Sequence, residues 1–332
     1  MRPLVSIYIP VRNRPELLSE TLNAIQAQSW HDWECWIVDD ASTDHTFEVI
    51  QSFERRDARF HGLRHTESRG DAAASNTALQ HLRGAYAARM DSDDVPLPDW
   101  LAVAMDFARS FQGVAFGCQA ELFGAVADLR MAKAKEIDPL RWQAWSLFND
   151  ENYHSGLIFR RDVQQAAALG YRALTVNNDW DFIHRLAQHG AVANLADTLV
   201  RIRRHADNST RAAIMREDRD SVSVAIRRSL LVERLGITPS DETMLLHCTA
   251  YPAPYWQFAD QAYVWLLRDD YPARLAAWLQ QLLAANSARG YPYDPTVLRT
   301  VLLDELLPGA TAHWLALPAT PPPTFKMDWL PD

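Results

Sequence analysis

The sequence contains few cysteines and no long apolar run. Its three cysteines, Cys35, Cys118 and Cys248, are widely spaced and form no C-x-x-C pair, so we expect neither a disulfide framework nor a thiolate metal site. No run of about 18 apolar residues occurs and the chain shows no signal-peptide pattern, so we expect no membrane-spanning helix. These absences are typical of a cytoplasmic protein.

Positive charge is also scarce. Lysine and arginine together number 33 against 42 aspartates and glutamates, which gives a net charge of -9. This balance argues against nucleic-acid binding, because nucleic-acid-binding proteins need a basic surface. The hydrophobic share of 48% is that of a globular protein, and 332 residues suit one large domain with an appendage, or two domains.

The loop after the first predicted strand contains no glycine. It reads Val11-Arg12-Asn13-Arg14-Pro15. Nucleotidylyltransferases and dinucleotide-binding dehydrogenases need a glycine-rich loop at this place, because their backbone approaches phosphate groups closely. Both enzyme classes are therefore disfavoured.

Strand and helix patterns alternate along the first part of the chain. Helical patterns occur at 15–25, 46–53 and 71–83, and buried-strand patterns at 5–9, 35–38, 60–64 and 85–90. This alternation predicts a mostly parallel sheet flanked by helices. Asp39 and Asp40 follow the second strand and the run Asp91-Ser92-Asp93-Asp94 follows the fourth. Both groups therefore fall at the carboxyl edge of the sheet, where ligands bind in α/β folds.

The strand patterns become less regular after residue 115 and stop near residue 210. Helices are predicted at 162–169 and 180–189, capped by Gly170 and Gly190, and strands at 157–159, 191–195 and 199–202. Beyond residue 210, helices are predicted at 221–235, 258–267 and 273–285. We therefore predict a domain over residues 1–210, with halves 1–115 and 116–210, and a helical region over 211–332.

The acidic cluster, Asp91-Ser92-Asp93-Asp94, is the strongest chemical signal. Two carboxylates one residue apart at a strand end can hold a hard divalent cation, which keeps positions open for the oxygens of a diphosphate. Short aspartate clusters are also frequent in solvated turns. The cluster alone is compatible with either role.

Several motifs together resemble those of family 2 glycosyltransferases, in that family's order and spacing. They are PLVSIYIPVRNRP at 3–15, VDDASTD at 38–44, RG to ASN at 69–76, GAY at 84–86, DSDD at 91–94, NDWDF at 178–182 and RRH at 203–205 with Ser209. The resemblance covers about residues 3 to 210. It implies a GT-A fold, which is a Rossmann-like α/β domain, followed here by a mainly helical C-terminal extension.

The same resemblance assigns the nucleotide site. Pro10 and Asn13 would border the nucleotide, and Asp39 would accept a hydrogen bond from the base, expected to be uracil N3–H. Arg69 would stack on or bond the base or the diphosphate. The competing interpretations are a turn-forming role for Asp39 and an exposed loop position for Arg69. Asp40 is expected to be structural.

Within the acidic cluster, the resemblance implies that one carboxylate binds the ribose hydroxyls and another binds Mn²⁺ or Mg²⁺. A D-x-D assignment selects Asp91 and Asp93, with Ser92 between them, whereas some relatives place the pair at Asp93 and Asp94. His205 matches a position that can complete the metal shell in relatives. A histidine after two arginines also suits the surface or a phosphate contact.

An inverting transfer requires one base, and the resemblance assigns it to Asp179 at a helix start, where the helix dipole stabilises a carboxylate. Helix capping is the alternative role. The acid that the family pairs with this base is replaced here by Asn178, which leaves Asp181 as a second candidate base. Asp71 stands where the family commonly has a small residue.

We therefore predict an inverting glycosyltransferase that uses a nucleotide-sugar, expected to carry UDP, and a glycan or lipid-linked glycan acceptor in bacterial surface-glycan biosynthesis. The Q-x-x-R-W motif and the membrane helices of processive relatives are missing, so we expect one sugar per encounter. A cytoplasmic location is expected, which allows peripheral contact with the inner face of the membrane. The competing function is a catalytically inactive scaffold that binds nucleotide-sugars or a protein, and Asn178 is the feature in its favour.

Overall fold

The chain divides into two units in a computed structural model, which describes residues 4–124, 135–174, 177–205, 219–251 and 269–315. Unit 1 comprises residues 1–139 and 151–208, and unit 2 comprises residues 140–150 and 209–332. The predicted boundary near residue 210 and the predicted helix at 258–267 lie outside the described residues.

Unit 1 begins with a parallel sheet. β1 (Val5–Val11) pairs in parallel with β2 (Trp33–Asp39) and with β4 (Tyr86–Arg89), and β2 pairs in parallel with β3 (Phe60–Arg64). Every residue of β1 is buried. This matches the continuous apolar run of the sequence, which is typical of a strand covered on both faces.

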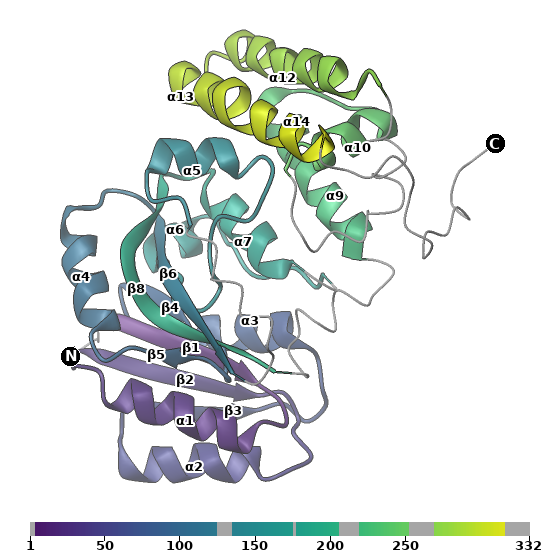
Figure 1. The fold of residues 1–332 in the computed structure, drawn as a ribbon. Helices are drawn as coiled ribbons and strands as arrows, with labels where there is room; N and C mark the ends of the chain where they lie inside the picture. Colours follow the sequence, from purple (N-terminus) through teal and green to yellow (C-terminus); the bar gives the residue numbers. More distant parts are fainter. Residues whose placement is uncertain (1–3, 125–134, 175–176, 206–218, 252–268, 316–332) are drawn as a thin grey trace. The chain divides into compact units, whose positions relative to one another are not determined.

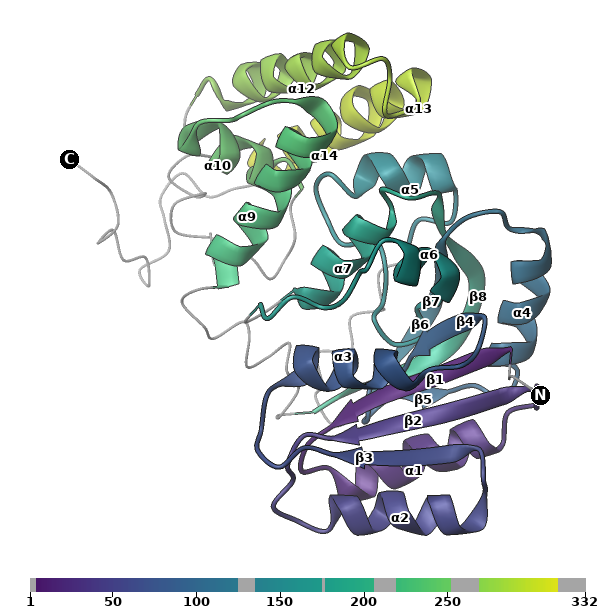
Figure 2. The same ribbon diagram turned by 180° about the vertical axis from the view of Figure 1, so that it is seen from behind.

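Helices cover both faces of this half of the sheet. α1 (Pro15–Gln26) and α2 (Thr46–Arg56) lie on one face (Figure 1), and α3 (Asp71–His81) lies on the other (Figure 2). Pro15 begins α1, where its missing N–H leaves no hydrogen bond unmade. The buried face of α1 includes Leu18, Leu22 and Ile25, as the helical period predicts.

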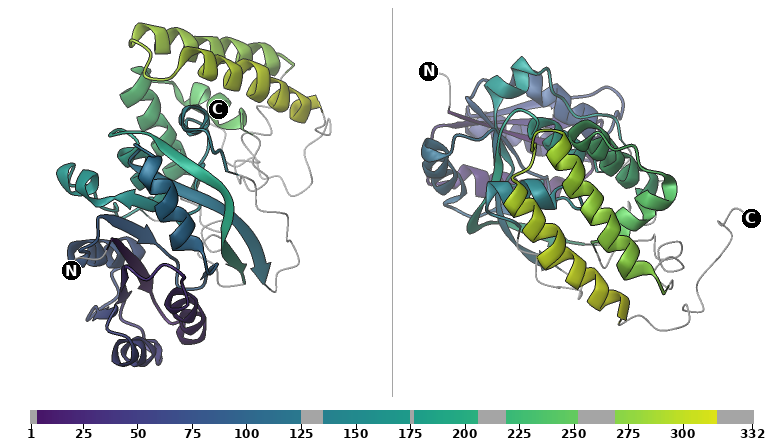
Figure 3. Two further views of the ribbon diagram at one scale, coloured as in Figure 1. Left: turned by 90° about the vertical axis from the view of Figure 1, so that its left-hand side faces the viewer. Right: turned by 90° about the horizontal axis from the view of Figure 1, so that it is seen from above.

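The other strands of unit 1 add short antiparallel pairings to the parallel ones, so the sheet is mixed. Its order is β3-β2-β1-β4-β7-β6-β8-β5. β6 (Ala115–Gly124) runs parallel to β8 (Val192–Arg204), and Figure 3 shows the two long strands side by side. β7 (Ile158–Arg160) and β5 (Val95–Pro96) pair antiparallel with their neighbours. The two strands predicted at 191–195 and 199–202 form the single strand β8.

The remaining helices of unit 1 are α4 (Trp100–Ser110), α6 (Arg161–Ala166) and α7 (Asn178–Leu186). The last two end earlier than predicted, so Gly170 and Gly190 are not helix caps. A Cβ on Gly170 would lie 2.8 Å from Asn76 Oδ1, and one on Gly190 would lie 2.6 Å from Val114 Cγ1. Both glycines therefore allow close packing instead of ending a helix.

The described part of unit 2 is helical. The predicted helices at 221–235 and 273–285 are confirmed as α9 with η1 and as α12. Figure 3 shows α12 beside the continuous stretch from α13 to α14. The elements of unit 2 are most of α5 (Pro139–Trp145), then α9 (Arg219–Leu230), η1 (Leu231–Leu235), α10 (Asp241–Thr249), α12 (Tyr271–Ala288), α13 (Pro295–Arg299), η2 (Thr300–Leu306) and α14 (Leu307–Leu315).

A buried histidine joins residues 140–150 to the later helices of unit 2. The ring of His247 stacks on Phe148 at 4.4 Å between centroids, and its Nε2 lies 3.0 Å from the Leu147 carbonyl oxygen. Trp278 Nε1 donates a hydrogen bond to His247 Nδ1 at 3.2 Å. Burial lowers the pKa of His247 to about 3. The ring is therefore neutral, with its hydrogen on Nε2.

All three cysteines are buried and none is in a disulfide. Burial raises the pKa of Cys118 to about 12 and that of Cys35 well above its usual value. A thiolate metal site is therefore disfavoured at these two cysteines, because metal binding requires the deprotonated sulfur. In the described residues, no helix is long and apolar enough to span a membrane.

Candidate active site

Two loops meet where β1 and β2 end. Asn13, in the loop after β1, has a left-handed backbone with φ 54°. Its N–H donates to Ser42 Oγ at 2.9 Å, and its Oδ1 accepts from the Thr43 N–H at 2.8 Å, so it links this loop to the loop after β2. Pro10 is buried in β1 and pairs with Val38. The structure thus brings Pro10 and Asn13 close to the end of β2.

Asp39 ends β2 and is fully buried. Its Oδ1 accepts a hydrogen bond from the Ser42 N–H at 3.0 Å. Its Oδ2 has no hydrogen-bond donor among the described residues, although Arg64 Nε lies 3.1 Å away. The contact with Arg64 is an ion pair whose N–H does not point at the oxygen. A buried acceptor without a donor is costly, and the ring N–H of a base would satisfy it.

Asp40 holds the loop that leads into α3. It accepts hydrogen bonds from Ser68 Oγ and from the N–H groups of Arg69 and Gly70, each at 2.8 Å, and pairs with His65 Nδ1 at 2.7 Å. Burial alone would raise the pKa of Asp40, but these donors lower it below its usual value. The side chain of Arg69 is exposed on this loop.

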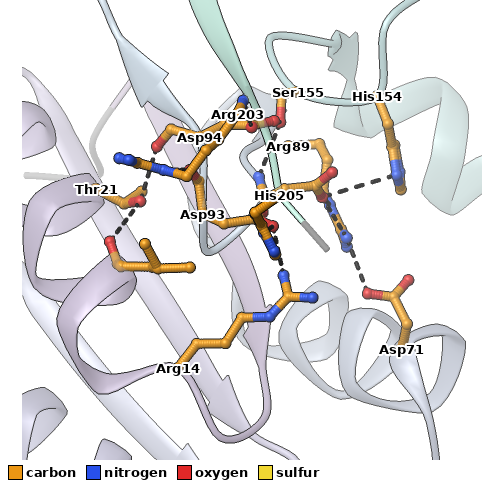
Figure 4. A network of polar contacts seen from close by, with 12 residues as sticks. Arg14, Thr21, Asp71, Arg89, Asp93, Asp94, His154, Ser155, Arg203 and His205 are labelled. Atoms are coloured by element: carbon orange, nitrogen blue, oxygen red, sulfur yellow. Dashed lines mark hydrogen bonds and ion pairs between the residues drawn. The ribbon is translucent and has the colours of Figure 1, made fainter. Parts of the chain in front are cut away.

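The carboxylate of Asp93 lies between an arginine and a histidine (Figure 4). Its Oδ2 accepts a hydrogen bond from Arg14 Nη1 at 2.6 Å and lies 2.8 Å from His205 Nε2. Asp93 is buried, and both partners are only partly exposed. The structure thus brings Asp93 and His205 together across 112 positions of the chain.

The carboxylate of Asp94 has different partners. Its Oδ2 accepts from Ser155 Oγ and its Oδ1 from the Arg203 N–H at 2.9 Å, while its backbone carbonyl accepts from Thr21 Oγ1 at 2.7 Å. Burial raises the pKa of Asp94 well above its usual value, and the neighbouring carboxylates raise it further. Asp94 therefore ties the cluster to β8 and α1. Ser92, beside it, is buried.

Asp91 lies against a buried arginine at the end of β4. Its Oδ1 accepts from Arg89 Nε at 2.9 Å and from Arg89 Nη2 at 2.7 Å, and lies 3.9 Å from His154 Nδ1. Burial alone would raise the pKa of Asp91, but Arg89 and His154 lower it below its usual value. With its pKa lowered, the carboxylate is ionised. It is also a third exposed, so a ligand can reach it.

Arg89 extends this contact toward the helix that carries Asp179. Its guanidinium, 3% exposed, also donates to Ser75 Oγ at 2.6 Å and to Asp71 Oδ1 at 2.9 Å. Asp71 Oδ2 in turn accepts from Asn178 Nδ2 at 3.3 Å. A continuous chain of contacts therefore leads from Asp91 to the first residue of α7.

Asp179 and Asp181 have different surroundings within α7. Asp179 Oδ1 accepts the N–H of Trp180 at 2.9 Å. Asp181 is buried, with Oδ1 held by Arg172 Nη1 at 3.0 Å and Oδ2 by Arg185 Nε at 2.9 Å. Since two arginines neutralise Asp181, it is badly suited to act as a base. Asp179 is the better candidate.

His154 is a member of the site that the sequence analysis did not single out. Its Nε2 lies 2.9 Å from Tyr171 Oη, and burial together with Arg89 lowers its pKa. The charges of Asp91, Asp179 and Asp71 oppose this shift. Arg14 and Arg89 were also missed as site residues. For Arg89 a signal existed, because a charged residue interrupts an apolar strand pattern.

No group of three or more histidine, cysteine, aspartate or glutamate side chains in the described residues is arranged to hold a metal ion. Asp93 Oδ2 and His205 Nε2 nevertheless lie 2.8 Å apart. One carboxylate and one imidazole suit Mn²⁺ or Mg²⁺ when oxygens of a substrate fill the other positions.

Residues 6–166 match the model of glycosyl transferase family 2. This part of the chain belongs to that family. It is 37% identical over 124 residues to TuaG of Bacillus subtilis, a glycosyltransferase named for teichuronic acid biosynthesis, covering 36% of this chain and 49% of that protein. It is 36% identical over 108 residues to WfgD of Escherichia coli, a UDP-Glc:alpha-D-GlcNAc-diphosphoundecaprenol beta-1,3-glucosyltransferase, covering 32% of this chain and 40% of that protein. The chain thus matches about half or less of the length of these two relatives.

Solved structures extend the likeness beyond the family 2 segment. Staphylococcus aureus TarS 1-349 in complex with UDP-GlcNAc has a TM-score of 0.59 at 17% identity, covering 94% of this chain and 88% of that one. A mannosyltransferase of Pyrobaculum calidifontis in complex with GDP-Man and Mn²⁺ has a TM-score of 0.52 at 19% identity, covering 95% and 88%. The predicted GT-A fold with a helical C-terminal region is confirmed by these likenesses.

Proposed function

We propose that the chain is an inverting glycosyltransferase that moves a sugar from a UDP-sugar to a hydroxyl group of a glycan or lipid-linked glycan, in bacterial surface-glycan assembly. The observation that carries the proposal is a chain of contacts that leads from the acidic cluster of the family 2 segment, through Arg89 and Asp71, to the helix of Asp179. UDP is favoured because WfgD is a UDP-Glc transferase by name and the structure of TarS 1-349 contains UDP-GlcNAc.

In this proposal the nucleotide half of the donor lies over the ends of β1 and β2. The buried Oδ2 of Asp39 accepts the N3–H of uracil, and Pro10 and Asn13 border the base. Arg69, exposed on the loop held by Asp40, contacts the base or the diphosphate. Asp91, which Arg89 keeps ionised, accepts hydrogen bonds from the ribose hydroxyls, with Ser92 next to it.

Asp93 and His205 would hold a Mn²⁺ or Mg²⁺ ion, which offsets the negative charge of the departing diphosphate. Arg14, now bonded to Asp93, then becomes available to the diphosphate oxygens. We assign a supporting role to Asp94, because both of its oxygens already accept hydrogen bonds. Of the two predicted assignments for the acidic cluster, we favour Asp91 for ribose and Asp93 for metal.

Asp179 is the proposed base. The acceptor oxygen forms a bond to the anomeric carbon as the bond from that carbon to the diphosphate breaks, and the hydroxyl proton passes to Asp179. Attack from the face opposite the leaving group inverts the configuration. The chain is proposed to transfer one sugar per encounter.

The test is a thermal-shift panel of UDP, GDP, dTDP and CMP, with and without Mn²⁺, on wild type, Asp93→Asn and the control Asp106→Asn, whose carboxylate is 81% exposed. Ligand at about 100 times its dissociation constant stabilises the folded state by about 2.7 kcal/mol. A Mn²⁺-dependent shift with UDP that is lost only in Asp93→Asn is expected. No shift with any nucleotide would refute the proposal, whereas a shift with UDP but no turnover would favour the inactive scaffold.

A further inference from the structure

Two unusual residues of this chain contact each other. Asn178, the first residue of α7, stands where the family pattern has an acid, and Asp71, the first residue of α3, stands where a small residue is common. Asn178 Nδ2 donates to Asp71 Oδ2 at 3.3 Å. Position 178 carries no carboxylate, and the carboxylate that it contacts belongs to α3.

Asp71 also belongs to the charge balance of a buried arginine. Arg89 Nη2 donates to Asp71 Oδ1 at 2.9 Å, and its other carboxylate partner is Asp91. A guanidinium buried to this degree needs opposite charge next to it, because a buried unpaired charge is strongly destabilising. One oxygen of Asp71 thus accepts a hydrogen bond from Arg89, and the other accepts one from Asn178.

The amide of Asn178 suits this arrangement better than an acid would. An aspartate at position 178 would bring a second carboxylate within hydrogen-bond distance of Asp71, and two like charges so close repel each other. The amide donates instead. The next residue in α7 is Asp179, the proposed base. The hydrogen bond from Asn178 to Asp71 therefore also fixes the start of that helix.

We propose that Asp71 is a positioning residue: with Arg89 it connects the acidic cluster to the start of α7 and thereby fixes the carboxylate of Asp179 relative to Asp91. This inference rests on the proposed function. It assigns Asn178 the role of hydrogen-bond donor to the carboxylate of Asp71 on α3.

The test is a double-mutant cycle of Asp71→Asn, Asn178→Asp and both together, with Asp106→Asn as the matched control for loss of a carboxylate. The first readout is the rate of UDP release from UDP-glucose and from UDP-N-acetylglucosamine with Mn²⁺, where water serves as the acceptor. The second is the affinity for UDP with Mn²⁺ by calorimetry, and the third is the melting temperature without ligand.

Each single variant is expected to lower kcat about tenfold, since a displacement of about 1 Å at a catalytic group can cost up to about 100-fold. Asp71→Asn removes the charge that balances Arg89, and Asn178→Asp sets two carboxylates against each other. In the double variant the amide introduced at position 71 donates to the carboxylate introduced at position 178. The pair keeps one negative charge and Arg89 keeps its contact with Asp91, so kcat should return to within about threefold of wild type. Affinity for UDP should change less than about threefold throughout.

The outcomes separate the two proposals. Normal turnover by the wild type, with losses that multiply in the double variant, overturns the inference alone. A wild type that releases no UDP from either donor and binds UDP no better than Asp93→Asn overturns the proposed function and the inference together. If Asn178→Asp does not fold, Asn178→Ala removes the donor without adding charge. It should lower kcat about tenfold with UDP affinity retained, and unchanged kcat would refute the inference.

Discussion

Two aspartates in the first turn of α7 differ in what they can do because their neighbours differ. Asp181 is neutralised by Arg172 and Arg185 on either oxygen, whereas Asp179 accepts a backbone N–H of its own turn. Both oxygens of Asp181 are thus occupied by guanidinium groups, so neither is open to the hydroxyl of an acceptor. At the scale of single residues, these arginines favour Asp179 as the proposed base.

Replacing Asp179 with asparagine should lower the rate of UDP release from a UDP-sugar by a factor of about 10² to 10⁴, the usual contribution of a general base. UDP affinity with Mn²⁺ should stay within about threefold of wild type, because no proposed nucleotide contact involves Asp179. Steady-state kinetics and calorimetry check both values. Turnover equal to that of the wild type would remove Asp179 from the mechanism.

Asp181→Asn is the matched control for that variant. It should lower the free energy of unfolding by about 1–3 kcal/mol, because two arginines lose a charged partner, while the folded fraction keeps its turnover. A large loss of turnover without loss of stability would reverse the assignment of the base.

The sequence located the residues of the site better than it located their partners. Asp39, Asp91 and Asp93 follow strands, so the strand pattern alone put them at one sheet edge. The hydrogen bonds of Asp94 to Ser155 and Arg203 join segments 61 and 109 positions apart. No local pattern reports such contacts, so the choice between the pair Asp91 and Asp93 and the pair Asp93 and Asp94 stayed open.

At the scale of elements, prediction was accurate where connections are short and strands are buried. β3 spans the predicted residues 60–64, and the helices of the first half match closely. β8 was predicted as two strands because Ala196, Asp197 and Thr198 are exposed between buried residues of the strand. β6 was not predicted, because most of its residues beyond Cys118 are only partly buried and its alternation is weak.

The packing of α10 against residues 140–150 predicts a pH dependence of stability. His247 has a folded-state pKa of about 3, below its ordinary value of 6.5. The unfolded chain therefore binds a proton that the folded chain excludes. Stability from this group is complete above about pH 6.5 and is lost as the pH falls toward 3, by about 2 kcal/mol at pH 5.

Calorimetric unfolding of wild type and His247→Gln between pH 4.5 and 7.5 checks this slope. The variant removes the titrating ring, so its loss of stability at pH 5 should be smaller than that of the wild type by about 2 kcal/mol. His189→Gln, which changes an exposed histidine of unit 1, serves as control and should leave the slope as it is. Equal slopes in wild type and His247→Gln would contradict the prediction.

At the scale of the whole molecule, the chain enters unit 2 twice. Residues 140–150 leave the glycosyl transferase segment to join the C-terminal helices, and Trp142, Leu147 and Phe148 are fully buried there. Burial of one such side chain is worth about 1.5–3 kcal/mol. A boundary drawn from sequence at residue 210 cannot reveal this, because the loss of strand patterning reports only where the second crossing occurs.

A fragment of residues 1–208 should therefore be less soluble and less stable than the intact protein, since those three side chains lose their cover. We expect it to bind a hydrophobic dye and to melt below the intact chain. The same fragment with Trp142→Ser, Leu147→Ser and Phe148→Ser should regain solubility. A fragment as soluble as the intact protein would show that residues 140–150 are not anchored in unit 2.

The burial of Cys35, Cys118 and Cys248 allows site-specific labelling of the protein. Buried thiols react slowly with maleimides at neutral pH. The native chain should therefore react very little with such reagents. A single cysteine introduced at an exposed position could then be labelled with a fluorophore without removal of the three native cysteines. The movement of individual elements during donor binding could then be followed in an otherwise unaltered protein.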